Sequence, residues 1–502
     1  MFHGTAPGLV HPAGIPEQHK AINLRLSKGY RSVLKNAAFV YASLLINQVS
    51  RAVYVVVLAR ILGPDLYGML SYGQAWYLAF LPLALLGMGP LLAHAVGRDR
   101  EEGARIANLV ASIRIVTILV TAIVSGVMGI SVSDSPAVST LMIVFAIALV
   151  GRAASLWADE MYQAYEVNRF SFNQAKVFRT TEVLLGMVLA LLTRDVVWVA
   201  VGHALVWVAQ GAWGLFQVIR HLQPLAPRWH WLEVRLLLIT GIPLGLSNVF
   251  GGLMIQGGII LYKGAGAENE LVGNLAINVQ ALMILGSLFV ALSRAALPAV
   301  SRSVARGDAN HRIYVSVMIR SAFVFGALAA VWALAIGADI VKLVLGPHYQ
   351  TAGQWLWLML WGLVPYIIKQ AVTNALVAHG SYGLTMWINL VGALSMAAAV
   401  LVLIEPYGFA GVVVGMLVGF TVDAVFGLLV MVRMKILDHV ADIPKLAAVL
   451  ALMVSIYLAV ASYQPLAAAI LATVVLVFGV ILSGIVRGNE KEAIWRLIRR
   501  RA

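Results

Sequence analysis

Apolar runs of about 20 residues recur along the whole chain, and short polar or basic segments separate them. Runs of this length cross the hydrocarbon core of a bilayer when they are helical. The pattern therefore predicts an all-α polytopic membrane protein with about 14 transmembrane helices. We place them near residues 36–58, 66–96, 105–129, 137–158, 178–193, 197–219, 236–262, 271–297, 313–336, 351–378 (kinked at Pro365), 384–404, 409–432, 445–461 and 465–486.

Basic residues are distributed unevenly between the segments that join these helices. If the N-terminus lies inside, most of the 36 Lys and Arg residues fall in cytoplasmic segments, and few fall outside (Arg60, Arg194, Lys263 and Lys342). Because basic loops stay in the cytoplasm, we predict a multi-pass protein with both termini cytoplasmic. The same bias accounts for the net charge of +14, so the charge gives no reason to expect nucleic acid as a partner.

The chain repeats itself at a spacing of about 205 residues, the offset between the matched positions below. Repeats of the same orientation are a common transporter design, with the binding site between them. We therefore predict two six-helix lobes around a central cavity, residues 36–220 and 236–433, joined by a cytoplasmic linker, 221–235. The matched positions are Gly68 with Gly273, Pro90 with Pro298 and Arg114 with Arg320.

Three segments fall outside the repeat. Residues 1–35 are predicted to be cytoplasmic, with an interfacial helix over 21–35, although a basic flank that only sets topology is the alternative. Residues 445–486 form two extra transmembrane helices. Residues 487–502 form a basic cytoplasmic tail.

Six cations lie well inside predicted helices, away from their first residues, and each costs about 2.5–3.5 kcal/mol near the bilayer centre. Few acidic residues accompany them, so the central cavity should be electropositive. Guanidinium groups suit phosphate and carboxylate oxygens, which favours an anionic substrate. We take as candidate substrate-binding residues Arg51, Arg114, Arg152, Arg320, Lys369 and Arg294.

The acidic and histidine positions give weaker signals. Asp423 is interpreted as the one deep acid, which either carries a coupling ion or pairs with an arginine. Glu182 is expected close to the cytoplasmic edge, in reach of water, and His203 is expected to be isolated. Uncharged polar residues could line the cavity or only join helices: Asn47, Gln48, Tyr54, Asn248, Gln256 and Asn278.

Motifs for an enzyme or a cofactor are not found. The chain has no cysteine, and it shows no metal-ligand spacing, nucleophile elbow or dinucleotide fingerprint. We therefore expect no cofactor, no metal and no catalytic residue.

Several segments resemble one known family. They are LKNAAFVYASLL, LARILGPDLYGMLSYG, LGMGPLLAHAVGRDREE and PAVSRSVARGD. The chain is similar, over roughly residues 32–440, to the Wzx-type lipid-linked oligosaccharide flippases of the multidrug/oligosaccharidyl-lipid/polysaccharide exporter superfamily.

The resemblance implies a function and a mechanism. Such proteins move an oligosaccharide on undecaprenyl pyrophosphate from the inner to the outer leaflet of the bacterial cytoplasmic membrane, by opening alternately to each side. It also implies that residues 445–486 guide the polyprenyl tail, and it makes a polysaccharide polymerase and a chain-length regulator possible partners beside membrane lipids. A multidrug or cation antiporter of the same superfamily, a membrane polymerase or ligase, and a scaffold are the alternatives. An antiporter for cationic drugs would need deep acids in the first six helices, where we find none.

Overall fold

The computed structural model describes residues 16–306, 310–437 and 442–484. Within these ranges the chain is helical throughout and contains no strand, as predicted. The helices are α1 (Pro16–Leu85), α2 (Met88–Arg98), α3 (Arg100–Ser131), α4 (Pro136–Ala164), α5 (Arg169–Thr193), α6 (Val196–His221), α7 (Trp231–Gly264), α8 (Asn269–Arg306), α9 (Asn310–Leu345), the 3-10 helix η1 (Pro347–Tyr349), α10 (Gln350–Trp361), α11 (Leu363–Ala378), α12 (Tyr382–Arg433), α13 (Asp442–Ala461) and α14 (Pro465–Leu482).

Two of these helices contain a turn at a glycine. The φ angle is 73° at Gly63 in α1 and 52° at Gly408 in α12. Glycine adopts positive φ at little cost because it has no Cβ atom, and Pro64 suits the start of the segment that follows. The turn at Gly63-Pro64 falls between the helices predicted over 36–58 and 66–96, and α1 and α12 each consist of two consecutive helical segments.

Other boundaries differ from the prediction. The backbone of α1 runs through residues 21–35 without a break, and a position of this segment at the membrane surface stays a prediction. The predicted second helix is interrupted at Gly87, where φ is again positive. α5 begins at Arg169, well before the predicted 178, because its first turns are polar and escape a search for apolar runs. The bend expected at Pro365 lies at Gly362, where α10 and α11 meet at 41°.

Ten helices in the described ranges are long and apolar enough to cross a membrane, or eleven if α10 and α11 count as one span. This finding agrees with a polytopic membrane protein. The count of 14 depends on dividing α1 and α12 at their glycines and on including α5, which does not meet that test. It remains a prediction.

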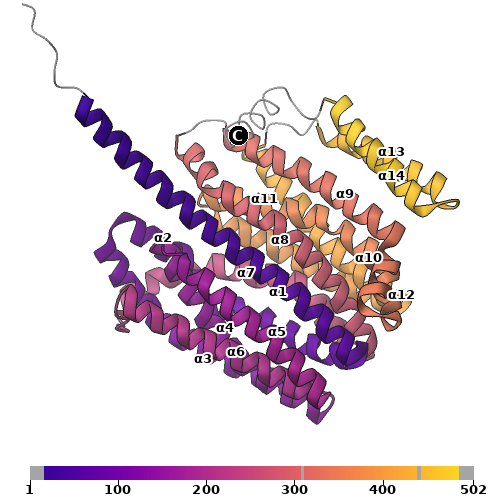
Figure 1. Ribbon diagram of the computed structural model, residues 1–502, viewed down its shortest axis with the longest axis horizontal. Helices are drawn as coiled ribbons and strands as arrows, with labels where there is room; N and C mark the ends of the chain where they lie inside the picture. The colour runs from indigo at the N-terminus through magenta and orange to yellow at the C-terminus, as the bar shows by residue number, and fades with distance from the viewer. Residues whose placement is uncertain (1–15, 307–309, 438–441, 485–502) are drawn as a thin grey trace, which may run out of the picture.

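The helices gather in two groups and a hairpin. α1–α6, here called the N-terminal half, pack mainly on one another, as do α7–α12, the C-terminal half. Figure 1 shows the two groups on opposite sides, with α1 and α7 where they meet. α13 and α14 form a hairpin that packs on α9.

One end of the bundle, which carries Gly63, Asp134 and Lys263, is called the turn end. Here the two halves meet through several contacts. Tyr349 donates its hydroxyl hydrogen to the Ala59 carbonyl at 2.9 Å, and Lys263 lies 2.8 Å from Asp134. The hydrogen bond from Lys263 lowers the pKa of the Asp134 carboxyl, which lies in the loop before α4. The opposite end, where residues 222–230 join α6 to α7, is called the linker end.

A crossing of α1 and α8 accompanies these polar contacts. A methyl group on Gly68 would overlap the backbone of Asn269, and one on Gly273 would overlap the carbonyl of Pro64. The two glycines therefore let the halves approach backbone to backbone at the turn end.

Substitution of these glycines tests the importance of the crossing. Gly68→Ala or Gly273→Ala should destabilise the fold by about 1–3 kcal/mol because neither backbone can yield to an added methyl group. The measurement is thermal unfolding of the purified protein in detergent. Gly97→Ala in α2 is the matched control, since nothing lies within 4 Å of the added methyl there. Equal melting temperatures for all three variants would contradict the importance of this crossing.

Candidate functional site

A hydrogen-bonded chain of polar side chains lies inside the N-terminal half. Arg152 in α4 donates to the Tyr77 hydroxyl of α1 at 2.7 Å. That hydroxyl lies 3.0 Å from Nε2 of His203 in α6, and Nδ1 of the same ring lies 2.8 Å from Glu182 of α5. Both distances fit a tautomer in which Tyr77 donates to Nε2 and the Nδ1 hydrogen faces the carboxylate. Four helices therefore contribute to one polar cluster.

Arg179 extends this cluster along α5. Its guanidinium group donates to Glu182 and to the side-chain oxygen of Gln210. The same group lies 3.8 Å from the ring centroid of Trp207, and Arg152 lies 4.5 Å from it. Two guanidinium groups thus share one aromatic ring, an arrangement that stabilises each cation by about 0.5–2 kcal/mol.

Arg51 lies where the two halves meet. Its Nε donates to Gln280 of α8 at 2.8 Å, and its charge is near enough to that of Arg152 for the two to repel. Gln280 is neutral, so it compensates none of the charge on Arg51. We call Arg51, Arg152 and Arg179 the arginine cluster: Arg179 pairs with Glu182 and shares the Trp207 ring with Arg152, and Arg51 is near enough to Arg152 for their charges to interact.

Two of the candidate cations lie in ion pairs of their own. Arg114 is fully buried and binds Glu160 of α4 at 2.5 Å. Lys369 in α11 is 5% exposed, and its ammonium group lies 3.8 Å from Asp423 of α12. Side chains buried in this way do not line an open cavity in this conformation. The structure therefore does not bring the six predicted cations together in one site.

The remaining two cations are described less fully. Arg320 is buried in α9, in the C-terminal half. Arg294 belongs to α8, but its side chain lies outside the described part of the chain.

The uncharged polar candidates are scattered. Tyr54 packs on Gly186, with its ring centroid 6.1 Å from that of His203, so it borders the polar cluster. Asn47 donates to its own helix at Ser43. Asn248 is exposed, while Gln256 and Asn278 are buried. Gln48 is half-buried. Their burial thus ranges from exposed to fully buried, and a role for them in lining a cavity stays a prediction.

The expectations for acids and histidine in the N-terminal half were wrong. Glu182 is 8% exposed and paired, not in reach of water, because α5 extends well beyond the predicted boundary and buries it. His203 is not isolated. The buried Glu182 also means that Asp423 is not the only deep acid. Arg179 was not selected as a candidate, because the predicted helix began at residue 178 and placed Arg179 at its edge. Its spacing of three residues from Glu182 was nevertheless a visible signal of an ion pair.

Asp423 pairs with a lysine rather than an arginine. Neither of its carboxylate oxygens accepts a hydrogen bond from any residue that the structure describes. No cluster of three or more His, Asp or Glu side chains that could hold a metal is found among those residues.

The helical fold in two halves is similar to the fold of known membrane transporters. Two solved structures match with a TM-score of 0.65. One is an inward-facing multidrug resistance MATE family transporter of the MOP superfamily, at 14% identity over 78% of this chain and 94% of that one. The other is the lipid II flippase MurJ, at 12% identity over 89% and 98%. A MATE transporter of Vibrio cholerae matches at 13% identity over 81% and 97%, with a TM-score of 0.53.

The chain belongs to the polysaccharide biosynthesis protein family, whose model matches residues 33–304, just over half of its length. A search of the curated proteins finds no match. The resemblance to flippases of this superfamily is thereby confirmed. Family and fold together indicate a lipid-linked flippase or a transporter of the same superfamily.

Removal of the Glu182 carboxylate, which pairs with Arg179, should lower the stability of the fold. Glu182→Ala leaves Arg179 buried without its counter-charge, for which we expect a destabilisation of about 3–5 kcal/mol. Glu102→Ala removes the exposed partner of Arg105 and should change stability by less than about 0.5 kcal/mol. Thermal unfolding in detergent measures both. If the two variants melt together, the pairing of Glu182 does not support the fold.

Proposed function

We propose that the protein flips undecaprenyl-pyrophosphate-linked oligosaccharide units from the cytoplasmic to the periplasmic leaflet of a bacterial inner membrane. The product would serve surface or exopolysaccharide biosynthesis, and both termini would be cytoplasmic. Membership of the polysaccharide biosynthesis family supports this substrate class. A polymerase and a chain-length regulator are the protein partners we propose.

The arginine cluster is the single observation that carries the proposal. A pyrophosphate group offers several anionic oxygens, and guanidinium groups bind such oxygens with paired hydrogen bonds. Glu182 pairs with Arg179, whereas the printed partners of Arg152 and Arg51 are the neutral side chains of Tyr77 and Gln280, which leaves positive charge to be neutralised. We assign pyrophosphate binding to Arg51 and Arg152, which are both half-buried, with Arg179 behind them.

The contacts between the halves support alternating access. Those at the turn end join residues of both halves through a hydrogen bond and an ion pair. If the turn end faces the periplasm, this arrangement is closed to the outside. Opening to that side would break these contacts, while the polar chain inside the N-terminal half can stay intact.

A multidrug or cation antiporter is the second candidate. The buried Glu182 is a deep acid in the N-terminal half, so the lack of such acids no longer argues against this candidate. However, this carboxylate already contacts Arg179 and His203, so a cationic drug would have to displace them. A flippase is therefore better supported than an antiporter.

Arg51→Ala should abolish polysaccharide output because it removes the cation nearest to the other half. The variant is expressed in a host that lacks its own copy of the gene, and surface polymer is measured beside protein abundance in the membrane. Arg60→Ala, nine residues along the same helix at an exposed position, is the control and should keep normal output. Normal output from Arg51→Ala at normal abundance would refute the assignment.

Asp423 is the proposed site of ion coupling, with Lys369 as its internal counter-ion. In reconstituted vesicles, flipping should depend on a proton or sodium gradient, and Asp423→Asn should remove that dependence because the neutral amide binds neither ion. Asp339→Asn, at an exposed position of α9, is the control. Flipping that needs no gradient in the unaltered protein would remove Asp423 from the mechanism.

A further inference from the structure

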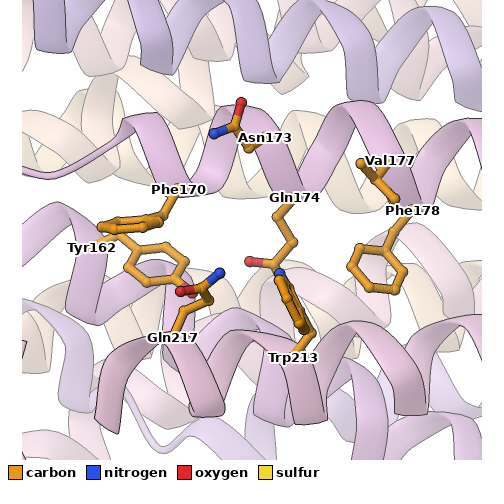
Figure 2. Close-up of a pocket in the computed structure, with 8 residues that line it drawn as sticks. All are labelled: Tyr162, Phe170, Asn173, Gln174, Val177, Phe178, Trp213 and Gln217. Carbon is orange, nitrogen blue, oxygen red and sulfur yellow. The ribbon is translucent and has the colours of Figure 1, made fainter. Parts of the chain in front are cut away.

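A groove lies between α5 and α6 near the linker end, and α4 forms part of its floor. Its volume is about 440 Å³, within the range of about 300–1,000 Å³ typical of small-molecule sites. Figure 2 shows Phe170, Gln174 and Phe178 of α5 facing Trp213 and Gln217 of α6, with Tyr162 of α4 beside them and Asn173 on the outer side of α5. We propose that this groove binds the neutral sugar headgroup of a glycosylated membrane lipid.

The polar groups of the groove call for a ligand that donates hydrogen bonds. Gln174 is 4% exposed, and its Nε2 already donates to the Gln210 carbonyl at 2.9 Å. The side-chain oxygens of Gln174 and Gln217 are buried and accept no hydrogen bond from the described residues. A buried acceptor without a donor costs about 1–3 kcal/mol. Hydroxyl groups of a ligand would supply the missing donors.

Aromatic rings form the apolar part of the groove. Tyr162 and Phe170 lie with ring centroids 5.4 Å apart, and Phe178 and Trp213 line the other side. The C–H faces of a sugar ring pack on aromatic rings while its hydroxyls reach polar groups at the edge. Amides and aromatic rings together thus match both surfaces of a pyranose.

The lining side chains of the groove favour a neutral headgroup over an ionic one. The eight lining side chains include no charged group. A phosphate would place its oxygens beside the unpaired oxygens of Gln174 and Gln217, which repel it. A choline group has no N–H or O–H to donate to these oxygens, and neither choline nor an ammonium group offers an acceptor for the N–H groups of Asn173. A neutral polyhydroxyl ligand meets both needs.

The groove opens on the apolar outer surface of the bundle. Val177 and Trp213 at its edge are 53% and 49% exposed. α6 continues this surface as a stripe at helical spacing, formed by Leu205, Val208, Phe216 and Ile219, all exposed. Exposed apolar side chains in a membrane helix face lipid. The sugar is therefore carried by a lipid, whose tail follows this stripe.

The floor of the groove connects with the arginine cluster. Gln174 donates to the backbone of Gln210, whose side chain in turn accepts from Arg179. A ligand on Gln174 is thus two hydrogen bonds away from the cluster. Sugar binding here is nevertheless a separate property, since it can be measured without transport.

Photo-crosslinking tests the proposal. The purified full-length protein is reconstituted in phosphatidylcholine vesicles and labelled with an alkyl maltoside that carries a diazirine in its alkyl chain. Because the diazirine is in the alkyl chain, adducts mapped by peptide mass spectrometry should concentrate along the exposed stripe of α6, in residues 205–219. Dodecyl maltoside, added below its critical micelle concentration, should compete with the label, and dodecylphosphocholine should not.

Substitutions in the groove test whether its side chains bind the sugar. Gln174→Leu keeps the size of the side chain and should weaken labelling by about 2–10-fold, the equivalent of one hydrogen bond. Asn173→Ala and Trp213→Ala change exposed positions of the groove and should weaken labelling even if Gln174→Leu folds poorly. Trp198→Leu, exposed at the far end of α6, is the control. Equal competition by dodecylphosphocholine would show a site for any lipid, and unchanged labelling of the groove variants would place the sugar elsewhere; either result overturns the proposal.

Discussion

A charge inside a membrane protein must find a counter-charge or enough hydrogen bonds, because its transfer from water costs several kcal/mol. This constraint organises the interior of the fold. Glu160 binds Arg114 and Glu182 binds Arg179, while Asp423 lies beside Lys369. Each of these pairs lies within one half. Arg51 is different, since its partner Gln280 is neutral and belongs to the other half.

The fold could be predicted well from the sequence because a bilayer demands long apolar runs. The turn at Gly63-Pro64 was also visible, since glycine and proline mark it directly. The beginning of α5 was not, because its first turns carry Asn173, Gln174 and Lys176 and look like a loop. Polar residues can begin a helix when neighbouring helices satisfy them, and such partners are distant in sequence. Gln174, for example, needs Gln210.

The candidate site could be predicted only in part. Depth along a helix identified Arg51 and Arg152 as costly charges, which was sufficient to select them. Pairing could not be predicted in the same way, because it depends on how helices rotate against one another. Arg114 was chosen together with its repeat equivalent, Arg320, yet Glu160 neutralises it from a different helix. The error about Glu182 followed from the error about α5, since a boundary placed too late puts an interior residue at the edge.

The neutral partner of Arg51 has a consequence for motion. When two opposite charges separate in a medium of low dielectric constant, the energy rises steeply with distance. Separation of Arg51 from Gln280 involves no such rise, since only one hydrogen bond, worth about 0.5–3 kcal/mol, is lost. The positive charge then stays with one half and is left without a ligand. An anion that binds Arg51 when the halves separate would replace the Gln280 side chain at little net cost. Binding of an anion and separation of the halves could therefore occur in one step.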